Sequence, residues 1–183
     1  MAELTERIMD HVTSTNIDRA MLMDYLSEFL AVEQGGIKLY RAALQIVQHD
    51  EIRRKFHEFH QETLKHVSIL EKVIGELGGD PGYQSTSAKI AEKKAEGLLQ
   101  TMTATNGMSA KLAEINAIEN IVLAETKDQA DWALLGKIAR QTTDSHLGDV
   151  LKAAVDEVEP EENEHLTWTK SKMAELAMGA VSE

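Results

Sequence analysis

Hydrophobic residues recur every three or four positions along four long stretches of the chain. A helix turns by about 100° per residue, so this spacing gathers the apolar side chains on one face and predicts amphipathic helices. A shorter and more charged stretch between the second and third has the same period and predicts a lesser helix. The expected core helices span residues 17–48, 51–78, 109–141 and 144–178, and the lesser helix spans residues 85–103.

The segments between these helices indicate how they are joined. The turn at His49-Asp50 is short, which makes the first two helices antiparallel neighbours. The segment GGDPGYQSTS, residues 78–87, stacks Gly, Pro and small polar residues and ends the second helix. The lesser helix then carries the crossover to the second pair. We therefore expect a single all-α domain over residues 1–183, with residues 1–15 as an N-terminal arm.

Two polar side chains interrupt the apolar face of the second helix. Glu62 and His66 lie between Phe59 and Ile69 on the face that should point into the core. A buried carboxylate or imidazole is costly unless a partner compensates it. The pattern therefore predicts that something neutralises this pair inside the molecule.

The second half of the chain repeats this arrangement. The aligned residues are Glu33 with Glu125, at an offset of 92 residues, and Glu62 with Glu161 and His66 with His165, at an offset of 99. Each half thus forms a helical hairpin with one lone acid and one acid–histidine pair. Two such hairpins predict a pseudo-twofold four-helix bundle in which four carboxylates and two histidines project inward, an arrangement by which bundles hold two metal ions.

The composition narrows the chemistry of such a site. Four carboxylates cancel the charge of two divalent ions, and neutral imidazoles complete the coordination without adding charge. Oxygen and nitrogen ligands without sulfur suit iron or manganese better than structural zinc, and the chain has no cysteine. A net charge of -12 argues against nucleic acid or an anionic membrane as partner. With no apolar run long enough to span a bilayer and no signal-like N-terminus, a cytoplasmic protein is expected.

At these residues the chain resembles the ferritin-like di-metal carboxylate superfamily, which includes ferritins, bacterioferritins, rubrerythrins and manganese catalases. Tyr40, seven residues after Glu33, resembles the first helix of ferritins and bacterioferritins, and ETLKHVSILEKVIGELGG at residues 62–79 resembles the second. A branch of small bacterial ferritin-like stress proteins has a similar second helix and crossover. The resemblance implies a ferritin-like antiparallel four-helix bundle with a helical crossover between helices 2 and 3.

The resemblance also implies a set of metal ligands. Carried over position by position, they are Glu33, Glu62, His66, Glu125, Glu161 or Glu162, and His165. Internal symmetry favours Glu161 on the fourth helix, whereas the family's three-residue spacing between acid and histidine favours Glu162. Asp128, one turn past Glu125, is a candidate for an additional ligand. Tyr40 is either a core aromatic or a residue that relays an electron or hydrogen-bonds a ligand.

The function implied is that of a non-haem di-iron protein, with two iron ions or alternatively manganese, that reacts with oxygen or peroxide. It would be a ferroxidase-like or peroxidase-like oxidoreductase served by an electron donor that the sequence does not identify. The alternative is a non-catalytic ferritin-like stress or interaction module with a structural or vestigial metal site. A monomer or a small homo-oligomer, such as a dimer, is expected rather than a storage cage.

Overall fold

The computed structural model describes residues 15–182, within which there are five α-helices and no strand. The helices are α2 (Arg19–Ala43), α3 (Asp50–Glu76), α4 (Thr86–Thr103), α5 (Ala110–Gln141) and α6 (Ser145–Val181). Nearly all of the expected N-terminal arm, residues 1–14, lies outside the described residues. The chain is thus all-helical, as its periodicity predicts.

Side-chain caps explain where most of the helices begin. Asp18 accepts hydrogen bonds from the first backbone N–H groups of α2, and Ser85, Ser109 and Asp144 do the same for α4, α5 and α6. At the start of α3, the buried carboxylate of Glu114 accepts from the backbone N–H groups of residues 48 and 49 at 2.8 and 2.9 Å. A residue of α5 therefore stabilises the turn between α2 and α3.

The first helix ends earlier than its apolar pattern suggests. The pattern extends to residue 48, but α2 ends at Ala43, and residues 44–46 form turns. Val47 is nevertheless 1% exposed, so it packs in the core from an irregular segment. Periodicity reports burial, and here it continues beyond the helix because Leu44 and Ile46 still pack against the second apolar cluster from the turn, next to the buried Val47.

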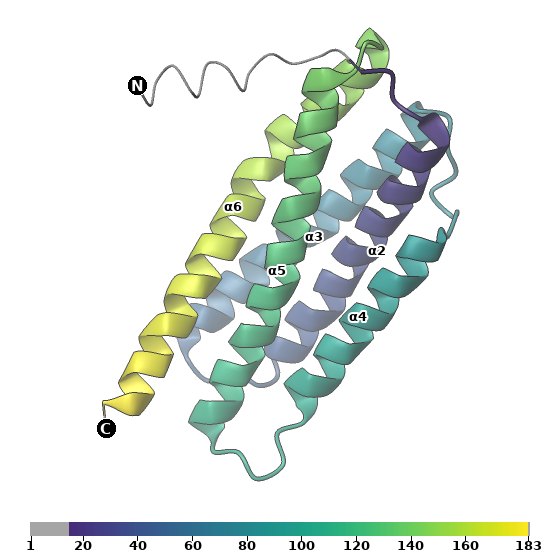
Figure 1. Cartoon of the computed structure of the whole chain (residues 1–183). Helices are drawn as coiled ribbons and strands as arrows, with labels where there is room; N and C mark the ends of the chain where they lie inside the picture. Colours follow the sequence, from purple (N-terminus) through teal and green to yellow (C-terminus); the bar gives the residue numbers. More distant parts are fainter. Residues whose placement is uncertain (1–14, 183) are drawn as a thin grey trace, which may run out of the picture.

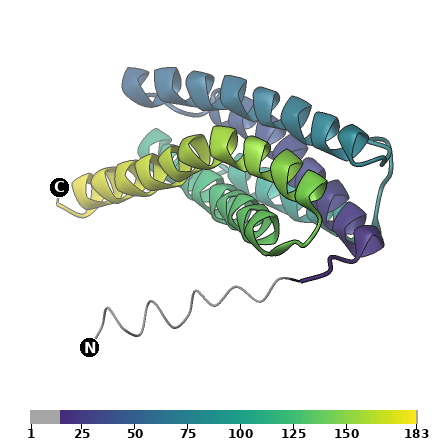
Figure 2. The ribbon, with the colours of Figure 1, turned by 90° about the horizontal axis from the view of Figure 1, so that it is seen from above.

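Helices α2, α3, α5 and α6 run side by side, and α4 lies against α2 and α5 on the outer edge (Figures 1 and 2). The close fit of α4 on α2 depends on Gly35, because a Cβ there would lie 2.7 Å from the Cβ of Ala95. The long crossover between the two hairpins is thus a packed helix. None of the described helices combines the length and apolarity needed to cross a membrane.

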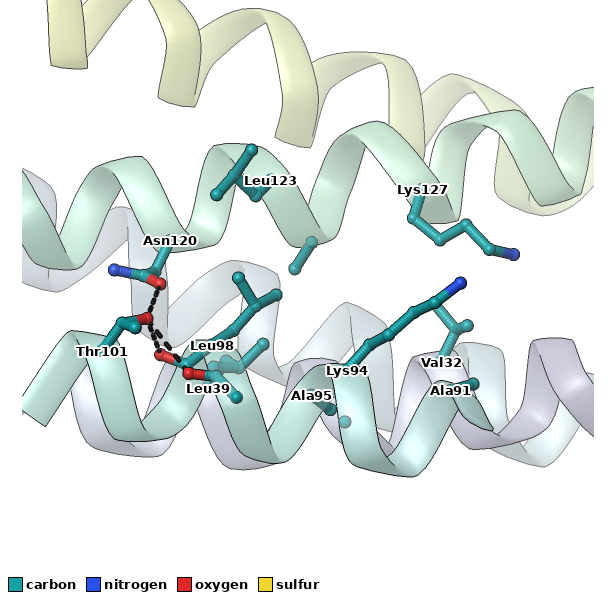
Figure 3. A pocket seen from close by; sticks show the side chains of 13 residues that line it. Val32, Leu39, Ala91, Lys94, Ala95, Leu98, Thr101, Asn120, Leu123 and Lys127 are labelled. Carbon is teal, nitrogen blue, oxygen red and sulfur yellow. Dashed lines mark hydrogen bonds between the residues drawn. The ribbon is translucent and has the colours of Figure 1, made fainter. Parts of the chain in front are cut away.

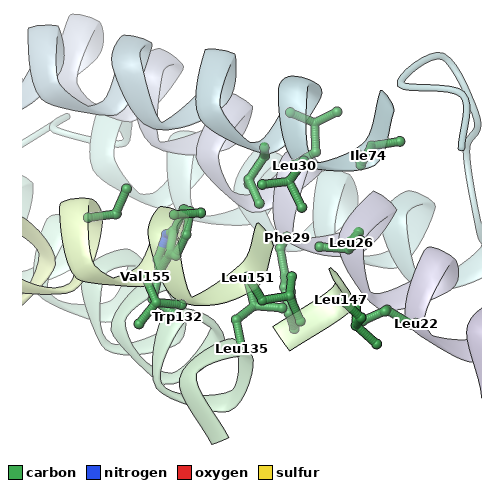
Figure 4. Close-up of a cluster of buried hydrophobic side chains, with 14 residues drawn as sticks. Leu22, Leu26, Phe29, Leu30, Ile74, Trp132, Leu135, Leu147, Leu151 and Val155 are labelled. Carbon is green, nitrogen blue, oxygen red and sulfur yellow. The ribbon is translucent and has the colours of Figure 1, made fainter. Parts of the chain in front are cut away.

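Two apolar clusters fill the space between the four long helices. The first contains Phe29, Leu70, Trp132 and Leu151 among others (Figure 4), and the second contains Phe56, Phe59 and Ile118 among others. On each of the four long helices, the stretch between the residues of the two clusters carries buried polar side chains: Glu33 on α2, Thr63 and His66 on α3, Glu125 and Asp128 on α5, and Glu162 and His165 on α6. A layer of polar side chains therefore crosses the middle of the molecule between the two apolar clusters.

Candidate metal centre

The polar layer contains buried atoms that have no hydrogen-bond partner. Among the described residues, the buried side-chain nitrogen and oxygen atoms in this state belong to Glu33, His66, Glu125, Asp128, Glu162 and His165. Both imidazoles present their Nδ1 atom in this way, and Glu162 presents both of its oxygens. Buried polar atoms are nearly always satisfied, so a cluster of unsatisfied ones points to a missing cationic partner.

Three of these side chains surround one point in the layer. Glu33 comes from α2, His66 from α3 and Glu162 from α6. His66 Nδ1 lies 2.9 Å from Glu162 Oε1 and 3.4 Å from Glu33 Oε1. All three residues are fully buried. One ligand-type atom from each lies within 4.8 Å of the others, which is the spacing of a group that could hold a metal ion.

A second group is formed around His165 and shares one member with the first. His165 Nδ1 lies 3.3 Å from Glu162 Oε1 and 3.4 Å from Glu125 Oε2. The two imidazole rings are stacked, with centroids 5.7 Å apart. The carboxylate of Glu162 therefore stands between the two histidines, while Glu33 and Glu125 each flank only one of them.

The opposite ring nitrogens contact two further acids. His66 Nε2 lies 2.8 Å from Glu161 Oε2, and His165 Nε2 lies 2.8 Å from Glu62 Oε2. Glu161 also accepts a hydrogen bond from Lys65 Nζ at 2.5 Å. Each acid thus contacts the histidine of the facing helix, and this contact fixes which ring nitrogen points inward.

Glu62, which was expected as a ligand, and Glu161, one of the two alternatives on the fourth helix, therefore lie outside the two groups. The reason is the spacing along the helix. Relative to the direction of a histidine, the residue four before it is rotated by about 40° to one side, and the residue three before it by about 60° to the other. In α6 the inward position belongs to Glu162, so of the two alternatives the structure places Glu162, not Glu161, in the metal-capable groups.

The corresponding inward position of α3 holds Thr63. Thr63 is 2% exposed, and its hydroxyl donates to the backbone carbonyl of Phe59 at 2.8 Å. It contributes no carboxylate to the layer. The two halves of the repeat are therefore alike in their lone acids and histidines but differ at this position.

Two aromatic residues bind the flanking acids across the core. The Trp132 indole donates to Glu33 Oε1 at 2.7 Å, and the Tyr40 hydroxyl donates to Glu125 Oε1 at 2.5 Å. Each aromatic lies seven residues after the acid of its own helix but binds the acid of the other helix. The internal repeat identified both aromatic residues in the sequence. Only the folded structure shows that each aromatic binds the acid of the other helix.

Burial and mutual contact shift the pKa values of the cluster in opposite directions. Burial raises the pKa of Glu33 to about 7, partly offset by His66. Burial alone would raise the pKa of Glu162, but its contacts with His165 and His66 lower it to about 2. Burial likewise would lower the pKa values of the histidines, yet their carboxylate contacts raise them to about 10 for His66 and about 11 for His165. Without metal, protons therefore take the place of cations beside the acids.

Asp128 lies at the edge of the same layer. It is 5% exposed, follows Glu125 by one turn of α5, and its Oδ1 has no hydrogen-bond partner. Burial raises its pKa, and the carboxylates of Glu33, Glu162 and Glu125 raise it further. The electrostatic neighbours of Asp128 are thus the acids of the two groups.

These residues fit a pair of divalent cations. The donor atoms are two imidazole nitrogens, the oxygens of the carboxylate that both groups share, and the oxygens of one flanking carboxylate in each group. A set of oxygen and nitrogen donors of this kind suits iron. The unsatisfied inward atoms of the same residues are the ones that cations would satisfy. The layer lies between the two apolar clusters, and the side chains of both metal-capable groups are buried.

Comparison with known proteins agrees with this chemistry. No curated protein and no solved structure matches the chain. A family model described as ubiquinone biosynthesis protein COQ7 matches residues 16–181, which is almost the entire chain. Proteins of that family hold a di-iron centre, and nothing found supports manganese. The chain therefore belongs to the COQ7 family, a di-iron carboxylate member of the ferritin-like superfamily.

Proposed function

We propose that this chain is a di-iron oxidoreductase that reacts with oxygen, built as a ferritin-like four-helix bundle with α4 as its crossover. The observation that carries the proposal is the pair of histidine Nδ1 atoms that face one shared carboxylate, Glu162, with every one of these inward atoms lacking a hydrogen-bond partner. The contacts of 2.9–3.4 Å among these atoms are not aligned as hydrogen bonds, and a cation shared by the acids and the imidazoles would satisfy the atoms that these contacts leave unsatisfied.

The residues divide into those that hold iron and those that orient the holders. The residues that would hold the ions are Glu33, Glu125, Glu162, His66 and His165, of which Glu162 belongs to both groups. Two iron ions, when bound, would supply the electrons that reduce oxygen. Glu62 and Glu161 fix the imidazoles from behind through Nε2.

Tyr40 has the geometry of a positioning residue. Its hydroxyl holds one oxygen of Glu125 and leaves the other directed at His165. Burial raises the pKa of Tyr40, and the neighbouring Glu125 raises it further, so the phenol stays protonated and acts as a donor. This supports hydrogen bonding to a ligand as the role of Tyr40.

Iron titration with an oxygen electrode tests the proposal. We expect the purified chain to bind about two irons and to consume oxygen when ferrous iron is added. A His66→Ala variant should lose bound iron and most of its oxygen consumption, because one inward nitrogen is removed. The matched control is His57→Ala, since His57 is exposed on the same helix.

Iron binding and oxygen consumption could also be separated in this experiment. Tight iron binding without consumption of oxygen or peroxide would identify the chain as the non-catalytic module and would overturn the oxidoreductase proposal. Repeated oxygen consumption with ferrous iron as the only electron donor would indicate a ferroxidase. Consumption of added peroxide would indicate a peroxidase.

A second candidate function is hydroxylation of an apolar substrate, and an apolar groove favours it. The groove has a volume of about 650 Å³ and lies between α4 and the helices α2 and α5 (Figure 3). Its walls include Val32, Leu39, Leu98, Leu123 and Ala124. Val32 and Ala124 directly precede Glu33 and Glu125, so the groove borders the turns that carry these acids. The matched family is a di-iron hydroxylase family of ubiquinone biosynthesis, which suggests a quinone-like substrate.

In a hydroxylation, one oxygen atom of O2 enters the substrate and the other leaves as water, which consumes two electrons and two protons. This second candidate therefore predicts that a prenylated quinol analogue stimulates oxygen consumption when a two-electron reductant is supplied. A Gly97→Leu variant should abolish the stimulation, because Gly97 lines the groove and a Cβ there meets nothing within 4 Å, so the side chain can enter the groove. Gly75→Leu is the control, since a Cβ at Gly75 also meets nothing within 4 Å but the residue lies away from the groove. Equal stimulation in both variants would exclude the groove as the substrate site.

A further inference from the structure

We propose that Asp128 is the fourth carboxylate of the metal centre and takes the place of the acid that α3 lacks at Thr63. The inference rests on the metal centre of the proposed function and specifies its ligand set. It begins from a deficit of charge. Two divalent ions carry four positive charges, whereas the two metal-capable groups contain three carboxylates, those of Glu33, Glu125 and Glu162.

The internal repeat locates the missing group. With the offset of 99 residues that aligns His66 with His165, the counterpart of Glu162 is Thr63. The Thr63 hydroxyl is engaged with the backbone of its own helix, so this position supplies no anion to the layer. A centre with full twofold symmetry would hold two shared acids, and this one holds a single shared acid.

The same comparison shows where an acid has been added. With the offset of 92 residues that aligns Glu33 with Glu125, the counterpart of Asp128 is Gly36. Gly36 is buried beside Thr63, whose Cγ2 lies 3.3 Å from the place of a Cβ at residue 36. One half of the molecule thus has two residues without charge at these positions, and the other half has two acids.

Among the described residues, none is a hydrogen-bond partner of the buried Oδ1 atom of Asp128. The neighbouring Lys127 is engaged by Asp131 at 2.5 Å and by Glu28 at 3.1 Å. A buried carboxylate among three others is unfavourable unless cations lie between them. Metal ions in the layer would provide that compensation and would bring the count to four carboxylates.

Metal titration of the full-length chain tests the assignment without relying on turnover. Cobalt(II) is the probe, added to metal-free protein and followed by its absorption spectrum and by metal analysis after desalting. We expect about two cobalt ions per chain in the original protein. Asp128→Asn should weaken the binding of at least one ion by more than about tenfold and change the cobalt spectrum, because one anionic ligand is lost. Asp149→Asn, on the exposed surface of α6, is the matched control.

Restoring an acid at the other position completes the test. The double variant Thr63→Glu/Asp128→Asn should recover two cobalt ions per chain, because the fourth carboxylate then comes from α3. If the double variant does not fold, Asp128→Asn alone decides the matter, since this exchange conserves shape and removes a buried charge. Unchanged stoichiometry, affinity and spectrum in Asp128→Asn would overturn the assignment. Intact cobalt binding without oxygen consumption would overturn the proposed function and leave the role of Asp128 standing.

Discussion

The position of one carboxylate decides whether the polar layer is one centre or two separate sites. Glu162 Oε1 lies 2.9 Å from His66 Nδ1 and 3.3 Å from His165 Nδ1, whereas Glu33 and Glu125 each approach a single histidine. Loss of Glu162 would affect both groups at once. At the scale of the residue, Glu162 is therefore the side chain on which metal binding depends most.

We expect Glu162→Gln to reduce iron content from about two ions per chain to well below one. The affinity should fall by more than about 100-fold, because changes of residues that only orient the ligands already cost 10- to 100-fold. Metal analysis after anaerobic loading measures the effect. Glu119→Gln on the exposed face of α5 should retain full metal content. Two tightly held irons in Glu162→Gln would show that the shared carboxylate is not a ligand.

Protons and metal ions compete for the same two nitrogens. The acids around them raise the pKa of His66 to about 10 and that of His165 to about 11, so both imidazoles carry a proton at neutral pH in the metal-free chain. A metal ion must displace that proton from Nδ1. Binding is therefore favoured as the pH rises toward these values and is weakened as the pH falls.

We expect cobalt(II) binding to release protons and its apparent affinity to increase between pH 6 and pH 8.5. The slope should approach about tenfold per pH unit for each proton released. Calorimetry in buffers with different heats of ionisation counts the protons. An affinity independent of pH over this range would mean that the imidazoles are already neutral before metal binds.

Positions along the contact between α2 and α4 differ in how much added side-chain volume they tolerate. Helix α4 approaches α2 closely at Gly35, where an added Cβ would lie 2.7 Å from the Cβ of Ala95. At Gly97, on α4, an added Cβ would meet nothing within 4 Å. The same substitution should therefore have opposite effects at two positions near the α2–α4 contact.

We expect Gly35→Ala to lower the free energy of unfolding by about 1–3 kcal/mol, because the two helices must move apart. Gly97→Ala should raise it by about 0.4–1 kcal/mol, because alanine reduces the entropy of the unfolded chain at no steric cost. Urea denaturation followed by circular dichroism compares the two variants with the original chain. A stabilising effect at Gly35 would mean that α4 is not held against α2 in solution.

At the scale of the whole molecule, the polar layer is a source of instability that metal should remove. Buried unsatisfied atoms and several carboxylates lie between two apolar clusters, in the middle of all four long helices. Any ion that binds only the folded chain stabilises it in proportion to the logarithm of its free concentration. Metal binding and stability are therefore linked across the whole domain.

We expect loading with cobalt(II), at a free concentration roughly a hundred times the dissociation constant, to raise Tm by about 10–20 °C. This follows from about 2.7 kcal/mol for each of two sites and about 2–4 °C per kcal/mol for a domain of this size. Differential scanning calorimetry with and without chelator measures the shift. Glu162→Gln should show little of it, and an equal shift in that variant would place the stabilising ion elsewhere.

The helical class, the approximate bounds of the helices, the internal repeat and the kinds of residue in the polar layer all follow from the order of the amino acids alone. Periodicity carries this information because it indicates the direction in which each side chain points around the axis of its helix. The family match confirms the di-iron superfamily that was inferred from two lone acids and two acid–histidine pairs: Glu33, Glu125, Glu62 with His66, and Glu161 or Glu162 with His165. Asp128 was no more than a candidate at that stage.

How the acids are shared between helices becomes visible only when the helices are packed together. The tertiary structure placed Glu62 and Glu161 behind the histidines of the facing helix, left Glu162 between the two imidazoles, and joined Tyr40 to Glu125. The angle around one helix leaves open how far its neighbour is shifted along the common axis. That shift, fixed by the packing of the two apolar clusters, determines which acid meets which histidine.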